Sequence, residues 1–281
     1  MRFTKMHGCG NDYVYLDLWE QAAPSDPAAL ARAVSDRHRG IGADGLILIG
    51  PSAQADAQMV MFNADGSQSQ MCGNGLRCAT RLAWDHGHLS SPVVRVETGA
   101  GILDCTCLLT ASGRCEQVRI AMGQPRLDAP AIPVSASGEP PLSIDHGVDQ
   151  LPAAIVIGMG NPHAVLFVDD PDTAPVTTAG PVIERHQAFP ERTNVEFVAR
   201  LADENGLSVL RQRTWERGSG ETEACGTGAC AATVAAMLTQ RIPYGEAIVR
   251  LNGGDLRVSW DGHGTVFLQG EAVTVFEGDW P

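Results

Sequence analysis

The sequence predicts an α+β protein built from two similar halves. The chain has 281 residues, which is enough for two domains that each bury a core. Strand-like segments bounded by turn residues occur in both halves. A Cys-Gly-x-Gly sequence opens a helix in each half, and the twelve residues from Cys72 share six identities, without gaps, with the twelve from Cys225. We interpret this similarity as a pseudo-repeat of two α+β halves that face each other.

The first half shows helix and strand signals in alternation. A helix is expected at 25–40, with Asp26 as N-cap, Pro27 in the first turn and Gly40 after the end. A second helix is expected from Gly73 to about His86, closed by Gly87. The other expected elements are strands at 45–50 and 57–63, a turn-rich loop at 63–70, a hairpin at 92–109 and a strand at 116–122.

The second half repeats this alternation. A Pro- and Gly-rich stretch at 124–152 predicts the start of a linker between domains. Strand, turn and strand are expected at 153–170, and a hairpin at 194–216. A helix from Gly226 to about Gln240 precedes a tail of short strands.

Composition and charge exclude several classes of protein. Apolar residues make up 44% and charged residues 19% of the chain, as in globular proteins. The net charge is −13, and no basic stripe is present, so we expect no nucleic-acid partner. No apolar run reaches the roughly 18 residues that span a bilayer, so we expect no membrane partner. The N-terminus has no apolar signal region, which favours a cytoplasmic location.

Eight cysteines invite a disulfide or metal interpretation. We expect reduced thiols, because disulfides are rare in cytosolic proteins. No C-x-x-C pair occurs, so no metal site is expected. Cys105 and Cys107 place two sulfurs on one face of a strand, where they are expected to be small core or surface side chains.

Cys72 and Cys225 stand where a helix start changes their chemistry. Unpaired N–H groups and the helix dipole favour the thiolate and lower the pKa of a cysteine there. The flanking glycines let N–H groups approach a carboxylate. Two such thiols can invert the carbon next to a carboxylate, because one removes a proton and the other returns one to the opposite face. The alternative is two ordinary helix starts with small buried residues.

Inversion of this kind often uses pyridoxal phosphate as an electron sink. That cofactor needs a Schiff-base lysine. Lys5 is the single lysine of the chain and lies in an apparent strand. The sequence therefore predicts chemistry without a cofactor.

Six segments together resemble the diaminopimelate epimerase family, whose members use two cysteines and no cofactor. The resemblance covers nearly the whole chain. The segments are "KMHGCGNDYVYLD" (5–17), "GIGADG" (40–45), "FNADGSQSQMCGNG" (62–75), "GMGNPHAV" (158–165), "ERTNVEF" (191–197) and "ERGSGETEACGTGACA" (216–231).

The resemblance implies two domains with an active site in the cleft between them. Residues 1–121 plus 271–281 would form the N-terminal domain, which carries Cys72. Residues 122–270 would form the C-terminal domain, which carries Cys225. Each domain would be a central helix wrapped by mostly antiparallel strands, and two chains would form a homodimer.

The implied reaction is an isomerisation of a small-molecule substrate. LL-2,6-diaminoheptanedioate would be converted to the meso form, in lysine and peptidoglycan precursor biosynthesis. Cys72 and Cys225 would be the acid/base pair. Substrate contacts would come from backbone donors and from side chains that hold the carboxylates and the distal end, and Glu216 and His163 would also tune the thiols. The backbone donors are Gly73, Asn74, Gly226 and Thr227, and the other contacts are Asn11, Asn63, Asn161, Asn194, Glu216 and Arg217.

Gly45 departs from the family pattern, which can carry Gln after the Asp of "GIGADG". A side-chain contact to the substrate is then lost or provided by another group. Each asparagine also has an ordinary alternative as a turn residue, and Glu216–Arg217 as a solvated pair.

Four other functions remain open. Proline or 4-hydroxyproline racemases carry His in place of Asn74 and Asp in place of Glu216, and phenazine-type isomerases lack the two thiols. A metal-binding or redox-sensing thiol protein would hold zinc or a stable disulfide. In a non-catalytic amino-acid-binding protein, both thiols would be superfluous.

Overall fold

The computed structural model describes all residues, 1–281. Its internal contacts divide the chain into two compact units. Unit 1 is Met1–Ala121 with Gln269–Pro281, and unit 2 is Met122–Leu268. The C-terminal end of the chain therefore belongs to the same unit as the N-terminus. The expected boundaries lie after 121 and after 270, and the division of the chain lies after 121 and after 268.

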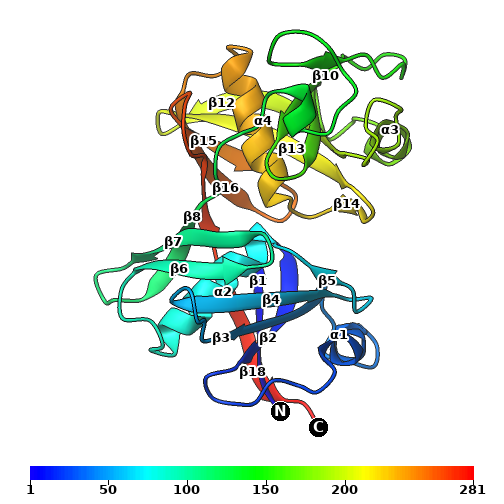
Figure 1. Cartoon of the computed structure of the whole chain (residues 1–281). Helices are drawn as coiled ribbons and strands as arrows, with labels where there is room; N and C mark the ends of the chain where they lie inside the picture. Colours follow the sequence, from blue (N-terminus) through cyan, green and yellow to red (C-terminus); the bar gives the residue numbers. More distant parts are fainter. The chain divides into compact units, whose positions relative to one another are not determined.

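Unit 1 contains two helices and a set of mainly antiparallel strands (Figure 1). Its elements are β1 (Arg2–Gly8), β2 (Asn11–Asp17), α1 (Pro27–Ser35), β3 (Gly45–Gly50), β4 (Ala57–Asn63), β5 (Gln68–Ser69), α2 (Gly73–Asp85), β6 (Val93–Thr98), β7 (Gly101–Leu109), β8 (Cys115–Ala121) and β18 (Val273–Asp279). The C-terminal strand β18 pairs antiparallel with β1, which explains why the tail belongs to this unit.

Unit 2 has the same kinds of elements in the same order. They are a 3₁₀ turn (Ala129–Ala131), β9 (Ser143–Ile144), β10 (Ala154–Gly158), β11 (Pro162–Phe167), α3 (Val176–Glu184), β12 (Asn194–Glu204), β13 (Leu207–Glu216), β14 (Gly220–Thr222), α4 (Gly226–Leu238), β15 (Gly245–Arg250) and β16 (Asp255–Trp260). Strand β17 (Phe267–Glu271) contains the division between the units.

Strand pairing follows one pattern in both units. In unit 1, β1–β2 is antiparallel, β2–β3 parallel, β3–β4 antiparallel and β4–β6 parallel. In unit 2, β10–β11 is antiparallel, β11–β12 parallel, β12–β13 antiparallel and β13–β15 parallel. The α+β class is confirmed, and the shared order and pairing support the pseudo-repeat that the two Cys-Gly-x-Gly sequences suggested.

Each unit packs its strands around one buried helix. In Figure 1, α2 and α4 are each surrounded by strands of their own unit. Nearly every residue of α4 is buried, and most of them are alanine or glycine. Small side chains let strands approach a helix from several sides, and a helix that is apolar all round belongs in a core. These two helices therefore fix where Cys72 and Cys225 lie.

Most of the expected elements occur where the sequence places them. Strands β3 and β4 have the expected limits, and α2 and α4 begin at the expected glycines. Helix α1 is shorter than expected and ends at Ser35, because the Asp36 carboxylate accepts hydrogen bonds from the N–H groups of His38 and Arg39 and turns the chain. The sequence reading missed α3, which contains Pro181, a residue that normally argues against a helix.

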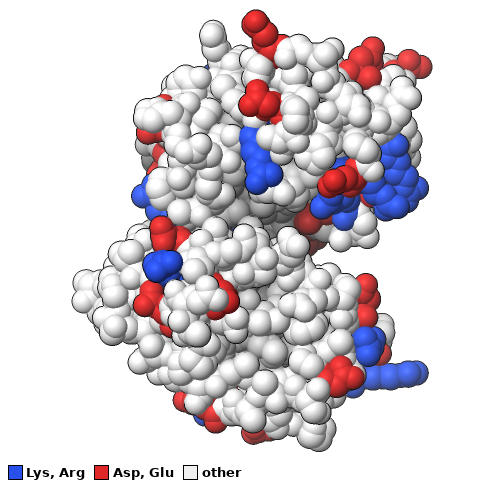
Figure 2. Space-filling view, in the orientation of Figure 1, with Lys and Arg blue, Asp and Glu red and all other residues white.

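Two properties of the whole chain bear on its partners. No helix has both the length and the apolar character that crossing a bilayer would need. On the face drawn in Figure 2, acidic and basic side chains lie in small groups of both signs.

Candidate functional site: two cysteine-capped helix starts

Both cysteines of the repeated sequence are helix N-caps. Cys72 caps α2 with extended backbone angles (φ −137°, ψ 121°), and Cys225 caps α4 in the same way (φ −113°, ψ 107°). The Cys72 Sγ accepts a hydrogen bond from the Gly75 N–H at 3.4 Å. The Cys225 Sγ accepts one from the Gly228 N–H at 3.3 Å. Sulfur thus does at both helices what a Ser or Asp oxygen does at most N-caps.

The second glycine of each sequence is required by close packing. A Cβ at Gly75 would lie 2.6 Å from Cδ1 of Ile47 in β3. A Cβ at Gly228 would lie 2.7 Å from Oε1 of Glu196 in β12. Each helix start therefore rests directly on a strand, and only glycine leaves room for the side chain beneath it.

The first glycine of each sequence, with the residue after it, forms the start of its helix. These four residues are Gly73, Asn74, Gly226 and Thr227. The first N–H groups of a helix have no partner within the helix. They can therefore serve as donors to an anion at either corner.

In unit 1, three polar side chains surround the Cys72 sulfur. The Cys72 thiol donates to Oδ1 of Asn11 at 3.3 Å, and the Asn74 amide donates to the same oxygen at 3.3 Å. The Tyr13 hydroxyl lies 4.0 Å from the Cys72 Sγ. Burial and the nearby Cys72 sulfur raise the pKa of Tyr13 well above its usual value, which keeps this phenol neutral. The Asn11 amide in turn donates to Asp44 at 2.7 Å.

A buried arginine supports this corner from behind. Arg77 is fully buried. It donates to Oδ1 of Asn74 at 2.9 Å and to the carbonyl of Glu271 at 3.2 Å, and its third nitrogen, NH1, has no partner. A chain of contacts thus runs from the guanidinium through Asn74 and Asn11 to the Cys72 sulfur.

In unit 2, a second set of polar groups surrounds Cys225. The Thr227 hydroxyl lies 3.6 Å from the Cys225 Sγ, and the Asn161 amide donates to that hydroxyl at 3.5 Å. His163 contacts Oδ1 of Asn161 through Nε2 at 2.9 Å and Glu196 through Nδ1 at 2.7 Å. Sequence reasoning named all of these residues except Glu196.

The surroundings of Cys225 shift its pKa in the direction opposite to the one expected from the sequence. Burial raises the pKa of the Cys225 thiol well above its usual value, and the carboxylates of Glu216 and Glu196 raise it further. The hydroxyl of Thr227 and the N–H of Gly228 lower it, but by less. The expectation that a helix start lowers the pKa is therefore wrong for Cys225, because desolvation and two carboxylates outweigh the helix terminus. These surroundings favour the thiol form of Cys225, which is the form that can deliver a proton.

Glu216 and Arg217 lie at the turn between β13 and β14. Glu216 accepts a hydrogen bond from the Thr222 hydroxyl at 2.6 Å, and the exposed Arg217 donates to the carbonyl of Glu191 at 2.9 Å. The Asn194 side chain is buried and is used within the protein, because it accepts from the Arg217 N–H at 2.9 Å and donates to the Pro162 carbonyl at 3.0 Å. Asn194 therefore anchors the turn that carries Arg217.

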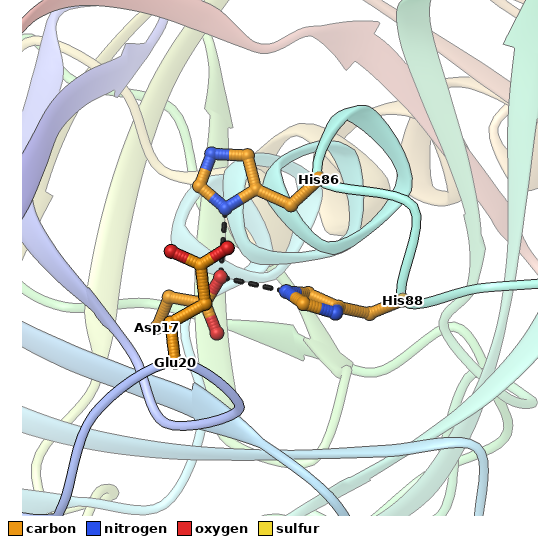
Figure 3. Close-up of side chains that lie close together, drawn as sticks. All are labelled: Asp17, Glu20, His86 and His88. Carbon is orange, nitrogen blue, oxygen red and sulfur yellow. Dashed lines mark hydrogen bonds and ion pairs between the residues drawn. The ribbon is translucent and has the colours of Figure 1, made fainter.

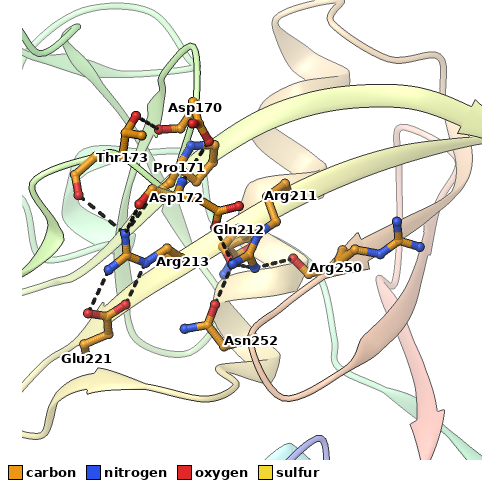
Figure 4. Close-up of polar contacts among 11 residues, drawn as sticks. Asp170, Pro171, Asp172, Thr173, Arg211, Gln212, Arg213, Glu221, Arg250 and Asn252 are labelled. Atoms are coloured by element: carbon orange, nitrogen blue, oxygen red, sulfur yellow. Dashed lines mark hydrogen bonds and ion pairs between the residues drawn. The ribbon is translucent and has the colours of Figure 1, made fainter.

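Arg213 holds the same hairpin in place (Figure 4). It donates to both oxygens of Glu221, at 2.7 and 3.0 Å, and so links β13 to β14. It also donates to the carbonyls of Pro171 and Asp172, at 2.9 and 3.1 Å. The loop before α3 is thereby joined to the turn that bears Glu216.

Asn63 and Gly45 behave differently from the other expected contacts. Asn63 ends β4, and its amide donates to the Ser67 hydroxyl at 3.0 Å in the turn that follows. Its side chain makes no hydrogen bond to the group around Cys72. Gly45 pairs with Asn63 in the strand register, and a Cβ there would lie 2.1 Å from the Phe62 carbonyl oxygen. Close approach of backbone in this structure thus explains why glycine occupies the position where the family can have Gln.

A separate cluster of possible metal ligands lies at the other end of α2 (Figure 3). The ligand atoms of Asp17, Glu20, His86 and His88 lie within 4.8 Å of one another. His86 Nδ1 and His88 Nε2 both lie 2.7 Å from the same oxygen of Asp17. These hydrogen bonds satisfy the group without an ion and tie the end of α2 to β2.

Sequence reasoning missed Tyr13, Asp44, Arg77 and Glu196. Glu196 alone left a clear signal, because a glutamate inside the apolar run "NVEFVA" is unusual for a buried strand. Arg77 left no signal in the sequence, since β1 and the returning C-terminal segment both lie against it.

Comparison with known proteins agrees with this geometry. A family model described as diaminopimelate epimerase matches residues 3–127 and 155–275. A diaminopimelate epimerase of Moorella thermoacetica is 48% identical over 285 residues, which cover 100% of this chain and 99% of the relative. A diaminopimelate epimerase of Bacillus cereus is 46% identical over 280 residues, which cover 98% and 96%.

Solved structures with lower identity share the fold. A phenazine biosynthesis protein of the PhzF family from Bacillus anthracis superposes with a TM-score of 0.72, at 16% identity, over 99% of this chain and 98% of that one. A probable proline racemase from Agrobacterium radiobacter K84 gives 0.69, at 19% identity, over 100% and 92%. With two capping cysteines, matching motifs along its whole length and relatives close to half identical, this chain belongs to the diaminopimelate epimerase family.

Proposed function

We propose that the chain converts LL-2,6-diaminoheptanedioate to the meso form by a two-base inversion that needs no cofactor. Cys72 and Cys225 are the acid/base pair. The observation that carries the proposal is the pair of cysteine N-caps, one at the central helix of each unit. Each offers a sulfur and the N–H groups of a helix start at the same place, which suits a carbon next to a carboxylate.

The surroundings of Cys225 favour a thiol that donates a proton. We therefore assign removal of the substrate proton to the sulfur of Cys72, which must first give up the proton that Oδ1 of Asn11 accepts. The carbanion that forms is stabilised through its carboxylate, which the N–H groups of Gly73, Asn74, Gly226 and Thr227 receive. After the reaction the two sulfurs have exchanged their protonation states, and the reverse reaction uses them in the opposite roles.

The remaining polar groups select the substrate. Asn11 and Asn161 lie beside the two thiols, and Arg217 offers an exposed guanidinium for a carboxylate. Asn63 is a further contact proposed for the distal amino-acid end, and Asn194 acts indirectly, because it anchors the turn that carries Arg217. A site built to bind such an end rejects analogues without it by about 10⁴-fold, because its own polar groups would be left unpaired.

Several further properties are proposed with the function. The enzyme works in the cytoplasm as a homodimer, and its product serves lysine and peptidoglycan precursor biosynthesis. The family resemblance supports these points.

Incubation of the pure protein with LL-diaminopimelate in D₂O tests the function. NMR should show the meso isomer appearing together with deuterium at the inverted α-carbon, and the double variant C72A/C225A is the control. Comparable inversion of L-proline would assign the chain to the proline racemases. Activity lost with a chelator and restored by zinc would favour the metal-binding alternative.

A further inference from the structure

Glu196 is a buried charge that the proposed reaction does not yet use. It lies in β12, where the first six residues are all buried, and none of its surface reaches solvent. A carboxylate in such a place is costly unless it is paired. Its Oε1 pairs with His163, and its Oε2 has no hydrogen-bond partner. The cost is therefore only partly offset within the fold.

Unit 1 demonstrates that the fold does not need a carboxylate here. The matching strand positions are found from the parallel pairings, in which Tyr13 faces Gly45 and His163 faces Asn194. Two residues further along these strands stand Ile47 and Glu196. Ile47 fills the space under the first turn of α2, as Glu196 does under α4. An apolar side chain thus supports the same helix start, so the charge of Glu196 serves another purpose.

Glu196 controls the orientation of His163. A carboxylate only accepts hydrogen bonds, so Nδ1 of His163 donates to Glu196 at 2.7 Å, and this contact fixes the ring. The other ring nitrogen, Nε2, lies 2.9 Å from Oδ1 of Asn161. Asn161 contacts Thr227, and Thr227 contacts the Cys225 sulfur. The Glu196 carboxylate is thus the buried end of a series of contacts that leads to Cys225.

Glu196 also lies close to the first turn of α4. A Cβ added at Gly228 would lie 2.7 Å from Oε1 of Glu196 and 3.2 Å from the sulfur of Cys225, so both groups contact the same helical turn. The charged groups that act on this thiol are Glu216 from β13 and Glu196 from β12, and both disfavour the thiolate.

We propose that Glu196 is a positioning residue for the inversion: its carboxylate holds the His163 ring through Nδ1, at the start of the contacts that lead through Asn161 and Thr227 to Cys225, and it places a carboxylate under the helical turn that bears this thiol. This inference rests on the proposed function. It assigns to Glu196 the part that a third group plays when it orients a catalytic histidine in other enzymes.

Two substitutions separate the hydrogen bond from the charge. E196Q keeps the shape and an oxygen that can accept from Nδ1, but it removes the charge. E196I removes both, and the example of Ile47 indicates that the fold accepts it. The control is E246Q, which removes an exposed carboxylate that pairs with Arg257 on the surface of the same unit. Thermal unfolding of each variant identifies any general loss of structure.

The first readout needs no substrate. Alkylation of Cys225 by iodoacetamide, followed by mass spectrometry of its peptide from pH 6 to 10, measures the thiolate directly. In E196Q and E196I, alkylation of Cys225 near neutral pH should be at least about threefold faster than in the unaltered chain, because a like charge has been removed. Alkylation of Cys72 in the same samples should not change.

The second readout is turnover of diaminopimelate. Loss of a group that orients a metal-bound histidine costs about 10- to 100-fold in affinity or activity, and we expect an effect of this order for His163. We expect kcat to fall about tenfold in E196Q and about 100-fold in E196I, with KM within about threefold. Unchanged kcat together with unchanged alkylation of Cys225 in folded E196Q and E196I would overturn the proposal. Absence of turnover by the unaltered chain would refute the proposed function instead, and the alkylation result would still stand.

Discussion

The two cysteine-capped helix starts have the same backbone but different polar surroundings. At α2, the polar contacts of Cys72 lead through Asn11 and Asn74 to a buried guanidinium, that of Arg77. At α4, burial raises the pKa of Cys225, and the carboxylates of Glu216 and Glu196 raise it further. A common fold thus surrounds the two thiols of one chain with different groups. Part of the difference lies in the strand beneath each helix, which presents Ile47 in one unit and Glu196 in the other.

The far ends of the two central helices differ in the same way. His88, which follows α2, contacts the carboxylate of Asp17 at the end of β2. At the matching positions after α4, the guanidinium of Arg241 lies 4.2 Å from the ring centre of Phe167, at the end of β11. One unit closes this contact with a hydrogen bond and the other with a cation–π contact. The two units thus share the position of this contact but differ in its chemistry.

Removal of either sulfur should have the largest effect on catalytic activity. C72A and C225A should each lower kcat for epimerisation by about 10³-fold or more, because inversion needs an acid on one face and a base on the other. Isomer ratios measured by NMR or chiral chromatography check this. If either variant retained substantial turnover, the two corners would not be equivalent partners in the reaction.

Alanine at the second glycine of each corner should separate packing from chemistry. In G75A the new methyl group meets Ile47, and in G228A it meets the carboxylate of Glu196. Both should lose about 1–3 kcal/mol of unfolding free energy from overpacking, measured by denaturant titration. G228A should in addition lower kcat more than G75A does at equal stability, because it displaces the group that holds His163. Equal losses of kcat would contradict the difference between the corners.

Loss of the Arg213 contacts that hold the β13–β14 hairpin should act mainly on substrate affinity. R213A frees the β13–β14 turn that carries Glu216 and Arg217, and it leaves Glu221 without its partner. We expect KM to rise about tenfold, equivalent to about 1.4 kcal/mol, with a smaller change in kcat. The control is R200A, which removes an exposed pair with Asp203 in the same unit. An unchanged KM in R213A would show that the contacts of Arg213 do not contribute to substrate binding.

The smallest effect concerns the far end of α2 at low pH. Burial alone would raise the pKa of Asp17, but hydrogen bonds from His86 and His88 lower it below its usual 3.8. A carboxyl group whose pKa is lower in the folded state stabilises the protein above about pH 4, and this contribution is lost as the pH falls through the folded pKa. D17N should therefore reduce stability at pH 6 by about 1–2 kcal/mol and flatten its fall below pH 4, as measured by thermal unfolding. An unchanged acid profile would mean that the cluster contributes no net stability.

The sequence determined most of the elements and both thiols. Strand limits, helix starts and the Cys-Gly-x-Gly repeat are local, since they depend on turn residues, apolar periodicity and capping within a few positions. The family motifs identified the neighbours of the thiols for the same reason. The order of strands in the pseudo-repeat could also be followed from the elements, although α3 was hidden by Pro181.

Only the tertiary structure decided which charged groups lie near each corner. A helix start favours a thiolate by itself, and that local rule fails at Cys225 because burial and two carboxylates act on it from other strands. Glu196 is 29 residues from Cys225 in the chain, and the parallel pairing of β11 with β12 brings it to His163. Arg77 is buried by contact with Glu271 from the returning C-terminal segment. Electrostatic effects depend on distance in space and on exclusion of water, and neither can be read from neighbouring letters of a sequence.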